Sequence, residues 1–310
     1  MFFSILVCMK KRIHLSLFAC LFFAGLAVGK AQTTIQLVDT FRYRAQDDAV
    51  ITVQINDSNM IVGSIGSGTA IEGFYFSAEG RVSAPFHEPE DTVNYTVASG
   101  INNHRVLCGY YGDGVSIKGF VRKGEKYHSF VAPVEHLGGA THIYSINDAD
   151  NVVGSYDYFG RPKAFAVIDG VFTPLPIPGA LEEARGINNL NQIVGDYSYL
   201  TIGNTYVGFL LDTDGSLMNV IFPGAQRTIP MAINDAGFIV GSWDDGVATH
   251  GCLIQLPSTF ISYDVPGAAN TMFTGINNNG TICGIYWVAR ELHPRRGPSR
   301  GFIAQMQTDK

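Results

Sequence analysis

Charge is scarce in this sequence: only 15% of its 310 residues are Asp, Glu, Lys or Arg, with 27 acidic against 21 basic residues. The first 31 residues hold four of the basic residues and no acidic one. Without that segment, 17 basic residues face 27 acidic ones, a net charge of −10. An acidic chain without a basic block argues against nucleic acid or anionic lipid as a partner.

Helical periodicity and long apolar runs are also missing after residue 31. No segment there repeats apolar residues at the 3.6-residue spacing of an amphipathic helix, and none is long enough to span a bilayer. The apolar fraction of 46% is nevertheless typical of a globular protein. We therefore expect a single large domain over residues 32–310, with a substantial core and no membrane span.

Residues 1–31 are interpreted as a secretory signal peptide. Residues 10–12 are Lys-Lys-Arg, residues 15–28 form an uncharged run, and small residues precede a cleavage site after Ala31. This pattern predicts export to the periplasm, the cell surface or the extracellular space. An uncleaved anchor is the alternative, and a start at Met9 in place of the first residue also gives an ordinary signal peptide.

The strongest pattern is a unit that occurs six times. Ile-Asn followed by Asp or Asn begins at Ile55, Ile101, Ile146, Ile187, Ile233 and Ile276, at spacings of 41 to 46 residues. A glycine follows each isoleucine by eight positions. Each unit divides into four short apolar segments joined by turns of Asn, Asp, Gly and Pro. Four strands in about 44 residues form the blade of a β-propeller, so we predict an all-β, six-bladed propeller.

Local residue choices fit this prediction. The turn after each Ile-Asn requires a residue that tolerates positive φ. Three Pro-Gly pairs, beginning at residues 178, 223 and 266, are predicted as type II turns. The residue before the isoleucine is small in five of six units, as expected where six first strands converge on the propeller axis.

The two ends of the chain predict how the ring closes. The sixth unit stops after a third strand, Gly301 to Met306, and a lone strand, Thr34 to Asp39, precedes the first unit. We predict that these two strands pair, so that the N-terminal strand completes the C-terminal blade. Such a closure removes exposed sheet edges.

The units also resemble a known family. Ser145 to Gly154 reads Ser-Ile-Asn-Asp-Ala-Asp-Asn-Val-Val-Gly, and Lys163 to Phe165 reads Lys-Ala-Phe. These segments resemble the bacterial probable extracellular repeat family (HAF repeats), named after its His-Ala-Phe tripeptide, and the resemblance covers nearly all of residues 50–305. The tripeptide is degenerate here, with Gly-Phe in four units and Gly-Cys in one. The resemblance implies export and a repeat fold, and it carries over no activity and no catalytic residue.

Three cysteines follow residue 31: Cys108, Cys252 and Cys283. In the repeat register Cys108 and Cys283 occupy a valine position, and Cys252 occupies a phenylalanine position. We therefore expect buried thiols that act as small apolar residues. No intrachain disulfide is expected, although an exported protein would permit one.

Function is most expected on the face that carries the loops between blades and between second and third strands. An aromatic residue stands there in five units, two positions after the repeat glycine: Tyr111, Tyr156, Tyr197, Trp243 and Tyr286. Aromatics beside aspartates suit a sugar, whereas their regularity favours packing between blades. The candidate ligand-binding aromatics are Trp243 and Tyr286 in register, and Tyr158, Phe159 and Trp287, which break the register.

The channel mouth is the second candidate site. His142, Glu182, Glu183, Arg185 and Arg227 precede or begin the first strands, and such a ring of mixed charge suits a small anion or a metal. Solvated loop charge is the alternative. No histidine or cysteine spacing indicates a metal site, so no metal or cofactor is expected. The six repeated asparagines either form a polar ring or cap their own turns.

Three functions remain open on the sequence. The first is a non-enzymatic, monomeric binding module for a glycan or another surface protein. The second is a carbohydrate-active enzyme with a carboxylate pair drawn from Asp91, Glu182 and Glu183. The third is a structural surface or matrix component. In addition, the long loop from Val288 to Ser299 is predicted to contact an acidic partner through a basic cluster: Arg290, Arg295, Arg296 and Arg300.

Overall fold

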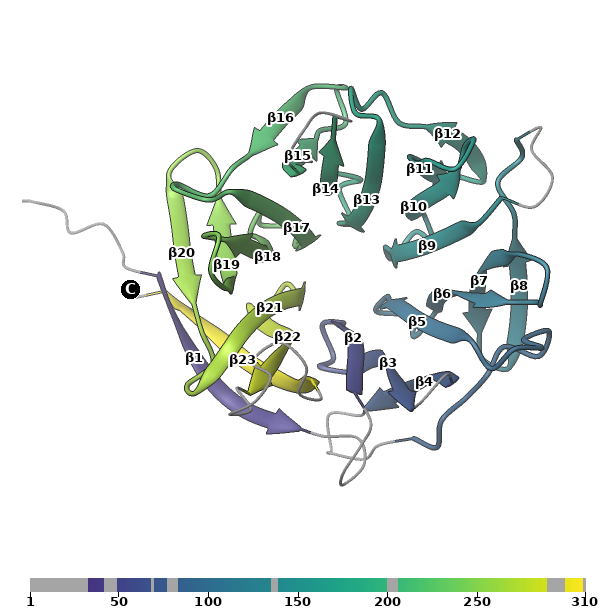
Figure 1. Ribbon diagram of the computed structural model, residues 1–310, viewed down its shortest axis with the longest axis horizontal. Coiled ribbons are helices and arrows are strands. Elements are labelled where there is room, and N and C mark those ends of the chain that lie inside the picture. Colours follow the sequence, from purple (N-terminus) through teal and green to yellow (C-terminus); the bar gives the residue numbers. More distant parts are fainter. Residues whose placement is uncertain are drawn as a thin grey trace, which may run out of the picture.

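The computed structural model describes residues 33–41, 49–67, 70–76, 83–134, 139–199, 206–288 and 299–308. Every regular element in these ranges is a β-strand. The strands form six sheets arranged around a central axis (Figure 1), which confirms the six-bladed β-propeller. The interpretation of residues 1–31 as a signal peptide concerns a segment outside the described residues.

The strands follow the six repeats in order. Blade 1 contains β2 (Ala49–Ile55), β3 (Ile61–Ser67) and β4 (Ala70–Phe76). Blade 2 contains β5 (Thr96–Ile101), β6 (Leu107–Gly112), β7 (Ile117–Lys123) and β8 (Lys126–Phe130). Blade 3 contains β9 (Thr141–Ile146), β10 (Val152–Asp157), β11 (Pro162–Ile168) and β12 (Val171–Pro174).

The other three blades complete the ring. Blade 4 contains β13 (Leu181–Ile187), β14 (Ile193–Ser198), β15 (Tyr206–Leu211) and β16 (Leu217–Val220). Blade 5 contains β17 (Arg227–Ile233), β18 (Ile239–Asp244), β19 (Thr249–Gln255) and β20 (Thr259–Tyr263). Blade 6 contains β21 (Ala268–Ile276), β22 (Thr281–Val288), β23 (Ser299–Thr308) and β1 (Thr33–Phe41).

The closure predicted from the chain ends is confirmed. Strand β1 lies antiparallel to β23 at the outer edge of blade 6, with Thr34 opposite Gln307 and Phe41 opposite Gly301. The two strands carry opposite ends of the colour scale in Figure 1 and lie side by side there. The N-terminal strand therefore joins the last blade to the first part of the chain by a ladder of eight paired positions, whose register shifts between Leu37 and Asp39.

Blade 1 departs from the expected four strands, because its described sheet contains only β2, β3 and β4. Residues 83–86 take the outer position instead. Phe86 forms an isolated bridge with Gly73, and the Ser83 N–H donates to the Tyr75 carbonyl. Pro85, which has no N–H, prevents a regular ladder at this point.

The repeat glycine has a clear packing role. In each blade it lies directly opposite the phenylalanine or cysteine of the third strand, as in the pair Gly195 and Phe209. A β-carbon on Gly195 would lie 2.0 Å from the carbonyl oxygen of Glu183 on the first strand and 2.9 Å from the Phe209 ring. Glycine is therefore needed for the close approach of the first and second strands.

The crowding expected near the axis is also confirmed. A β-carbon added to Gly186 would lie 2.8 Å from the Cα atom of Ala232 in the next blade. The turns behave as expected in most places. The fourth residue after each repeat isoleucine has positive φ: Asn59, Arg105, Asp150, Asn191, Gly237 and Gly280.

The Pro-Gly turns are a partial correction. Gly224 and Gly267 have the positive φ that a type II turn requires. Gly179 does not have it, so the predicted type II turn at Pro178-Gly179 is wrong. Glycine is used there for space instead, because a β-carbon would lie 2.8 Å from Cβ of Tyr197.

The core lies between neighbouring blades and includes the thiols. Cys108, Cys252 and Cys283 are free and buried, as expected. Burial raises the pKa of Cys108 and of Cys283 to about 12, so these thiols stay protonated and act as small apolar groups.

Candidate functional site

The first strands do not run smoothly along the central channel, because a β-bulge interrupts each of them. The bulge leaves one residue of the first strand out of register with the second strand. A bulge of this kind redirects a side chain. The six residues concerned are Ile51, Ser99, Tyr144, Arg185, Met231 and Thr274, and all six line the channel.

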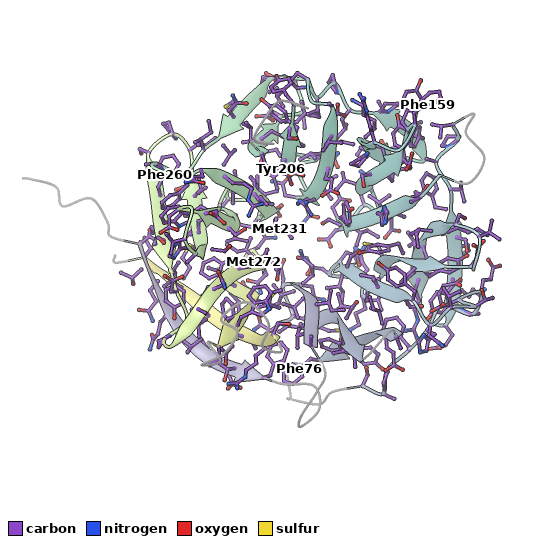
Figure 2. All side chains as sticks on the ribbon, in the orientation of Figure 1. Phe76, Phe159, Tyr206, Met231, Phe260 and Met272 are labelled. Atoms are coloured by element: carbon purple, nitrogen blue, oxygen red, sulfur yellow. The ribbon has the colours of Figure 1, made fainter. Side chains whose placement is uncertain are left out.

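The channel holds a cavity of about 140 Å³ with two unlike walls. One wall is apolar and includes Met231, Met272 and Ile285. The opposite wall contains Tyr144 and Arg185, with Ser99 and Tyr110 beside them. Figure 2 places Met231 and Met272 at the inner edge of blades 5 and 6. The bulges therefore turn the axis of the propeller into a pocket with a polar side and an apolar side.

One end of the channel is closed by the repeated asparagines. The Nδ2 atom of each donates to the backbone carbonyl of the equivalent asparagine in the next blade, at 3.0–3.1 Å, so that six hydrogen bonds form a closed ring. The Oδ1 atom meanwhile accepts backbone N–H groups of its own turn, as Asn188 does from Leu190 and Gln192. Each repeated asparagine therefore does both things expected of it: its Nδ2 atom forms the polar ring, and its Oδ1 atom caps its own turn.

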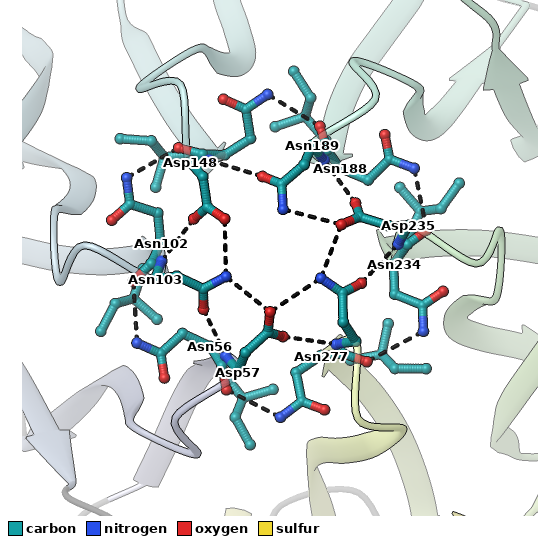
Figure 3. A pocket seen from close by; sticks show the side chains of 18 residues that line it. Asn56, Asp57, Asn102, Asn103, Asp148, Asn188, Asn189, Asn234, Asp235 and Asn277 are labelled. Atoms are coloured by element: carbon teal, nitrogen blue, oxygen red, sulfur yellow. Dashed lines mark hydrogen bonds between the residues drawn. The ribbon is translucent and has the colours of Figure 1, made fainter.

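A second ring lies directly beside the first. The residue after each asparagine alternates between acid and amide around the channel: Asp57, Asn103, Asp148, Asn189, Asp235 and Asn278 (Figure 3). The Oδ1 atom of each accepts the backbone N–H of the preceding member at 2.8–2.9 Å. Amide Nδ2 groups also donate to carboxylate Oδ2 atoms, as Asn103 does to Asp57 and Asp148. Reasoning on the sequence missed this ring, although the alternation was visible in the repeat.

The other end of the channel contains a partly buried ion cluster on blade 4. Arg185 donates from Nε to Asp196 and from Nη2 to Glu183. Burial lowers the pKa of Arg185, but the carboxylates of Asp196 and Glu183 outweigh burial. The net effect is a pKa above the ordinary value for arginine. Arg185 therefore carries its charge inside the protein, where a charge requires such partners.

A mouth cavity of about 330 Å³ adjoins the channel cavity, since Arg185 lines both. Its rim contains two further ion pairs. Glu182, only 3% exposed, pairs with Lys163, and Arg227 pairs with Asp244 at 3.2 Å. Burial raises the pKa of Glu182, and Lys163 offsets part of that rise. The alternative of solvated loop charge therefore does not describe Glu182 and Arg185, which are held in ion pairs.

His142 lies in an aromatic group beside the cluster. Its ring is 4.6 Å from the Tyr110 ring, edge to face, and is stacked at 5.9 Å on Tyr144. Burial lowers the pKa of His142 to about 4, and the negative charge of Asp157 opposes this shift. The neutral imidazole is therefore part of the aromatic wall at neutral pH. Arg185 and Arg227 line the mouth cavity, whereas His142 lies behind Tyr144, whose ring is 5.8 Å from the Arg185 guanidinium.

The aromatic candidates are distributed differently. Tyr286 is only 5% exposed and packs between blades 5 and 6. Trp243 is held by stacking on Phe222 at 4.6 Å and on His250 at 4.7 Å. Trp287 packs against the apolar cluster between blades 6 and 1. The interpretation that the regular aromatics pack between blades therefore describes Trp243 and Tyr286, which do not line the channel or the mouth cavity.

Tyr158 and Phe159 are exposed on the turn between β10 and β11. Their rings contact each other at 4.8 Å, and their exposed fractions are 43% and 70%. Figure 2 places Phe159 at the outer rim of the ring, far from the axis. These two residues therefore do not belong to the channel site.

The proposed carboxylate set is divided between distant blades. Glu182 and Glu183 are neighbours on β13, whereas Asp91 lies between blades 1 and 2. Asp91 accepts hydrogen bonds from the Thr96 hydroxyl at 2.6 Å and from two backbone N–H groups. Burial raises the pKa of Asp91, but these hydrogen bonds outweigh it and keep the pKa below its ordinary value. Asp91 thus organises its own turn.

The sequence also raised the questions of a metal site, a membrane span and a basic cluster. Within those ranges, no group of three or more His, Cys, Asp and Glu side chains is arranged to hold a metal ion. No helix among the described residues is long and apolar enough to cross a membrane. Of the basic cluster, Arg290, Arg295 and Arg296 lie outside the described residues, and Arg300 lies on β23 with its guanidinium 6.0 Å from the centre of the Tyr286 ring.

Comparison with known proteins supports the fold alone. No family model and no curated protein sequence matches the chain. Among solved structures, a putative gluconolactonase is similar at 12% identity and a TM-score of 0.52, over 89% of this chain and 99% of the other. A gluconolactonase from Xanthomonas campestris is similar at 12% identity and a TM-score of 0.51, over 90% and 91%. TolB from Acinetobacter baumannii is similar at 10% identity and a TM-score of 0.50, over 84% of this chain and 56% of TolB.

Proposed function

We propose that this chain is an exported, non-enzymatic binding module that acts as a monomer and takes its ligand into the central channel from the mouth at Arg185. The observation that carries the proposal is the channel itself. Six bulges direct side chains into it, a double ring of polar residues closes one end, and two adjoining cavities open at the other. A concave pocket with one apolar wall and a few convergent polar groups is typical of a small-molecule site.

The ion pairs at the mouth favour binding over hydrolysis. A glycosidase needs one carboxylic acid to give a proton and a second carboxylate to act as base or nucleophile. Here Glu182 is engaged with Lys163, and Glu183 and Asp196 are both engaged with Arg185. Burial raises the pKa of Glu182 and of Asp196, but each of the three carboxylates is paired with a cation, and a carboxylate in such a pair is not free to exchange a proton with a substrate. The enzyme alternative is therefore not favoured.

Ligand-induced thermal stabilisation tests the binding function. A library of neutral and charged small molecules is screened for compounds that raise the melting temperature of the chain from residue 32 onward, since a ligand of the folded state stabilises it. Hits are repeated on Met231→Trp, which fills the channel cavity, and on Leu190→Trp, which changes an exposed turn. The proposal requires shifts that Met231→Trp abolishes and Leu190→Trp retains. Shifts that survive in Met231→Trp, or a library without hits, contradict it.

Export is tested separately. Residues 1–31 are fused to alkaline phosphatase, which is active only after export from the bacterial cytoplasm. Activity that is lost when residues 10–12 are changed to Ser supports a signal peptide, because the positive n-region is required for export. An inactive fusion contradicts the exported location and leaves the channel proposal unaffected.

A further inference from the structure

We infer that the ligand of the channel is a neutral saccharide of one sugar ring, bound with its hydroxyl edge on Arg185 and Glu183 and its C–H face on the tyrosine wall. This inference rests on the binding function proposed above and names the ligand class of that site. It is carried by the charge around the mouth, by the hydrogen-bonding groups of the Arg185 cluster and by the shape and polarity of the two cavities.

The fixed charges around the mouth favour an uncharged ligand. Three cations, Lys163, Arg185 and Arg227, are paired with four carboxylates, those of Glu182, Glu183, Asp196 and Asp244. The surplus of one negative charge disfavours an anionic ligand. A cationic ligand would lie against the Arg185 guanidinium, which lines both cavities. Either charge would be placed where burial makes repulsion costly.

The Arg185 cluster presents a donor and an acceptor side by side. A guanidinium has five N–H donors, and Arg185 uses Nε for Asp196 and Nη2 for Glu183. Among the described residues, its Nη1 group donates to no protein acceptor. Glu183 keeps acceptor capacity, since its Oε1 receives only a long hydrogen bond of 3.4 Å from the Tyr144 hydroxyl. A hydroxyl group both accepts and donates, so adjacent sugar hydroxyls complement this pair.

The rest of the pocket suits the apolar face of the same ring. Tyr110 and Tyr144 supply aromatic surface on one side of the channel, and Met231 and Met272 supply soft apolar surface on the other. These side chains line the channel cavity of about 140 Å³, which adjoins the mouth cavity at Arg185. The mouth cavity, about 330 Å³, is itself at the small end of ligand pockets, which begin near 300 Å³. The site therefore has room for one ring and not for an extended oligosaccharide.

The inference is tested by isothermal titration calorimetry with matched sugars. The probes are methyl glycosides of neutral pentoses, hexoses and deoxyhexoses, each compared with its uronic acid and its amino sugar. We expect saturable binding of at least one neutral glycoside and binding of its charged partners that is weaker by about tenfold or more, as expected for burying an unpaired charge. Equal binding of the neutral and charged forms would overturn the inference.

Substituted variants test where the sugar binds, and they distinguish the saccharide inference from the binding function itself. Glu183→Gln should weaken binding of the neutral glycoside by about tenfold, the usual cost of losing a charged acceptor. Glu125→Gln is the control, because this carboxylate is 93% exposed, and it should leave binding unchanged. Near-ultraviolet circular dichroism checks the fold, and Met231→Trp serves as the second variant if Glu183→Gln is unfolded. Non-sugar ligands that bind in a Met231-dependent way, with no sugar binding, overturn the saccharide and leave the binding function standing. Failure of every compound overturns both.

Discussion

The repeat glycine shows how strongly a single residue is constrained in this ring. Its neighbours are backbone atoms of the first strand and a buried ring of the third strand, as at Gly195. The first-strand backbone cannot move without shifting the strand that lines the channel. The spacing of Ile-Asn and glycine in the sequence is thus a consequence of backbone contact and not of turn conformation.

Gly195→Ala should therefore destabilise the protein strongly. The added β-carbon would lie 2.0 Å from the Glu183 carbonyl oxygen, so the two strands must separate. We expect a loss of about 3 kcal/mol in the free energy of unfolding, at the upper end for overpacking. Urea denaturation measures it. Gly124→Asn is the control, because φ there is +59° and no atom lies within 4 Å, and equal stability of the two variants would refute the contact argument.

The ring of repeated asparagines gives a second prediction at this scale. In Asn188→Asp the Nδ2 donor becomes a carboxylate oxygen, 3.1 Å from the Asn234 carbonyl and 2.8 Å from Gln192 Oε1. The side chain keeps its shape, but the Asn234 carbonyl and Gln192 Oε1 lose their donor. The substitution also buries a carboxylate charge. We expect a loss of about 3 kcal/mol, greater at pH 7 than at pH 4, where the acid regains a donor. A variant as stable as wild type at pH 7 would show that the ring contributes little.

His142 predicts a pH dependence. Its pKa falls from an ordinary 6.5 to about 4 in the folded protein, chiefly through burial. Between these values the unfolded chain binds more protons, so stability is full above pH 6.5 and declines as the pH falls toward 4. Compared with His142→Gln, the wild type should lose about 2 kcal/mol more between pH 7 and pH 4.5. Urea titrations of both proteins at the two pH values measure the difference, and parallel losses would contradict the burial of His142.

Among the elements, β1 has the most distinct role, because it is separated from its partner β23 by the whole length of the chain. Its side chains alternate between exposed and half-buried, with Ile35 and Leu37 packed against the core between blades 5 and 6. This alternation is that of an outer strand, although the strand was predicted from the missing fourth strand of the sixth unit.

Deleting residues 32–41 should open the ring. The loss includes a ladder of eight paired positions and the packing of Ile35 and Leu37, so we expect a cost of several kcal/mol. Melting is compared with that of the chain starting at residue 32. A synthetic peptide of residues 32–41 added to the deletion variant should restore part of the lost stability. An unchanged melting temperature after the deletion would rule out the closure.

The bulged first strands mark the limit of prediction at the level of elements. An alternating pattern assigns every second residue of a strand to one face. A bulge shifts that assignment by one residue, so Arg185, Tyr144 and Met231 reach the channel only because the register is broken before the repeat isoleucine. Nothing in the local sequence marks the bulge. For this reason the sequence left solvated loop charge open as the alternative for Arg185, whose side chain is found partly buried in two ion pairs.

For the whole molecule, the blade number and the closure followed from the sequence because both depend on repetition and on the two irregular ends. The channel site did not follow in the same way. His142, Arg185 and Arg227 were placed at the mouth by strand order, but the sequence did not show their partners. Arg185 and Arg227 pair with Asp196 and Asp244 on the second strands of their own blades. His142 contacts Tyr110 across the boundary between blades 3 and 2, a contact that exists only once the ring is assembled. The exposed aromatics Tyr158 and Phe159 were chosen because they broke the register, which indicates a variable turn and not a pocket.

The alternating acid–amide ring at the closed end also limits how many blades the propeller can have. Acid and amide alternate at successive blades, from Asp57 through Asn278 and back to Asp57. An alternation of two residue types closes into a ring only when the number of blades is even. Gain or loss of a single repeat would place two carboxylates, or two amides, next to each other at the axis. Parity therefore restricts this ring to change by pairs of blades, and it discriminates against a chain that closes with five or seven.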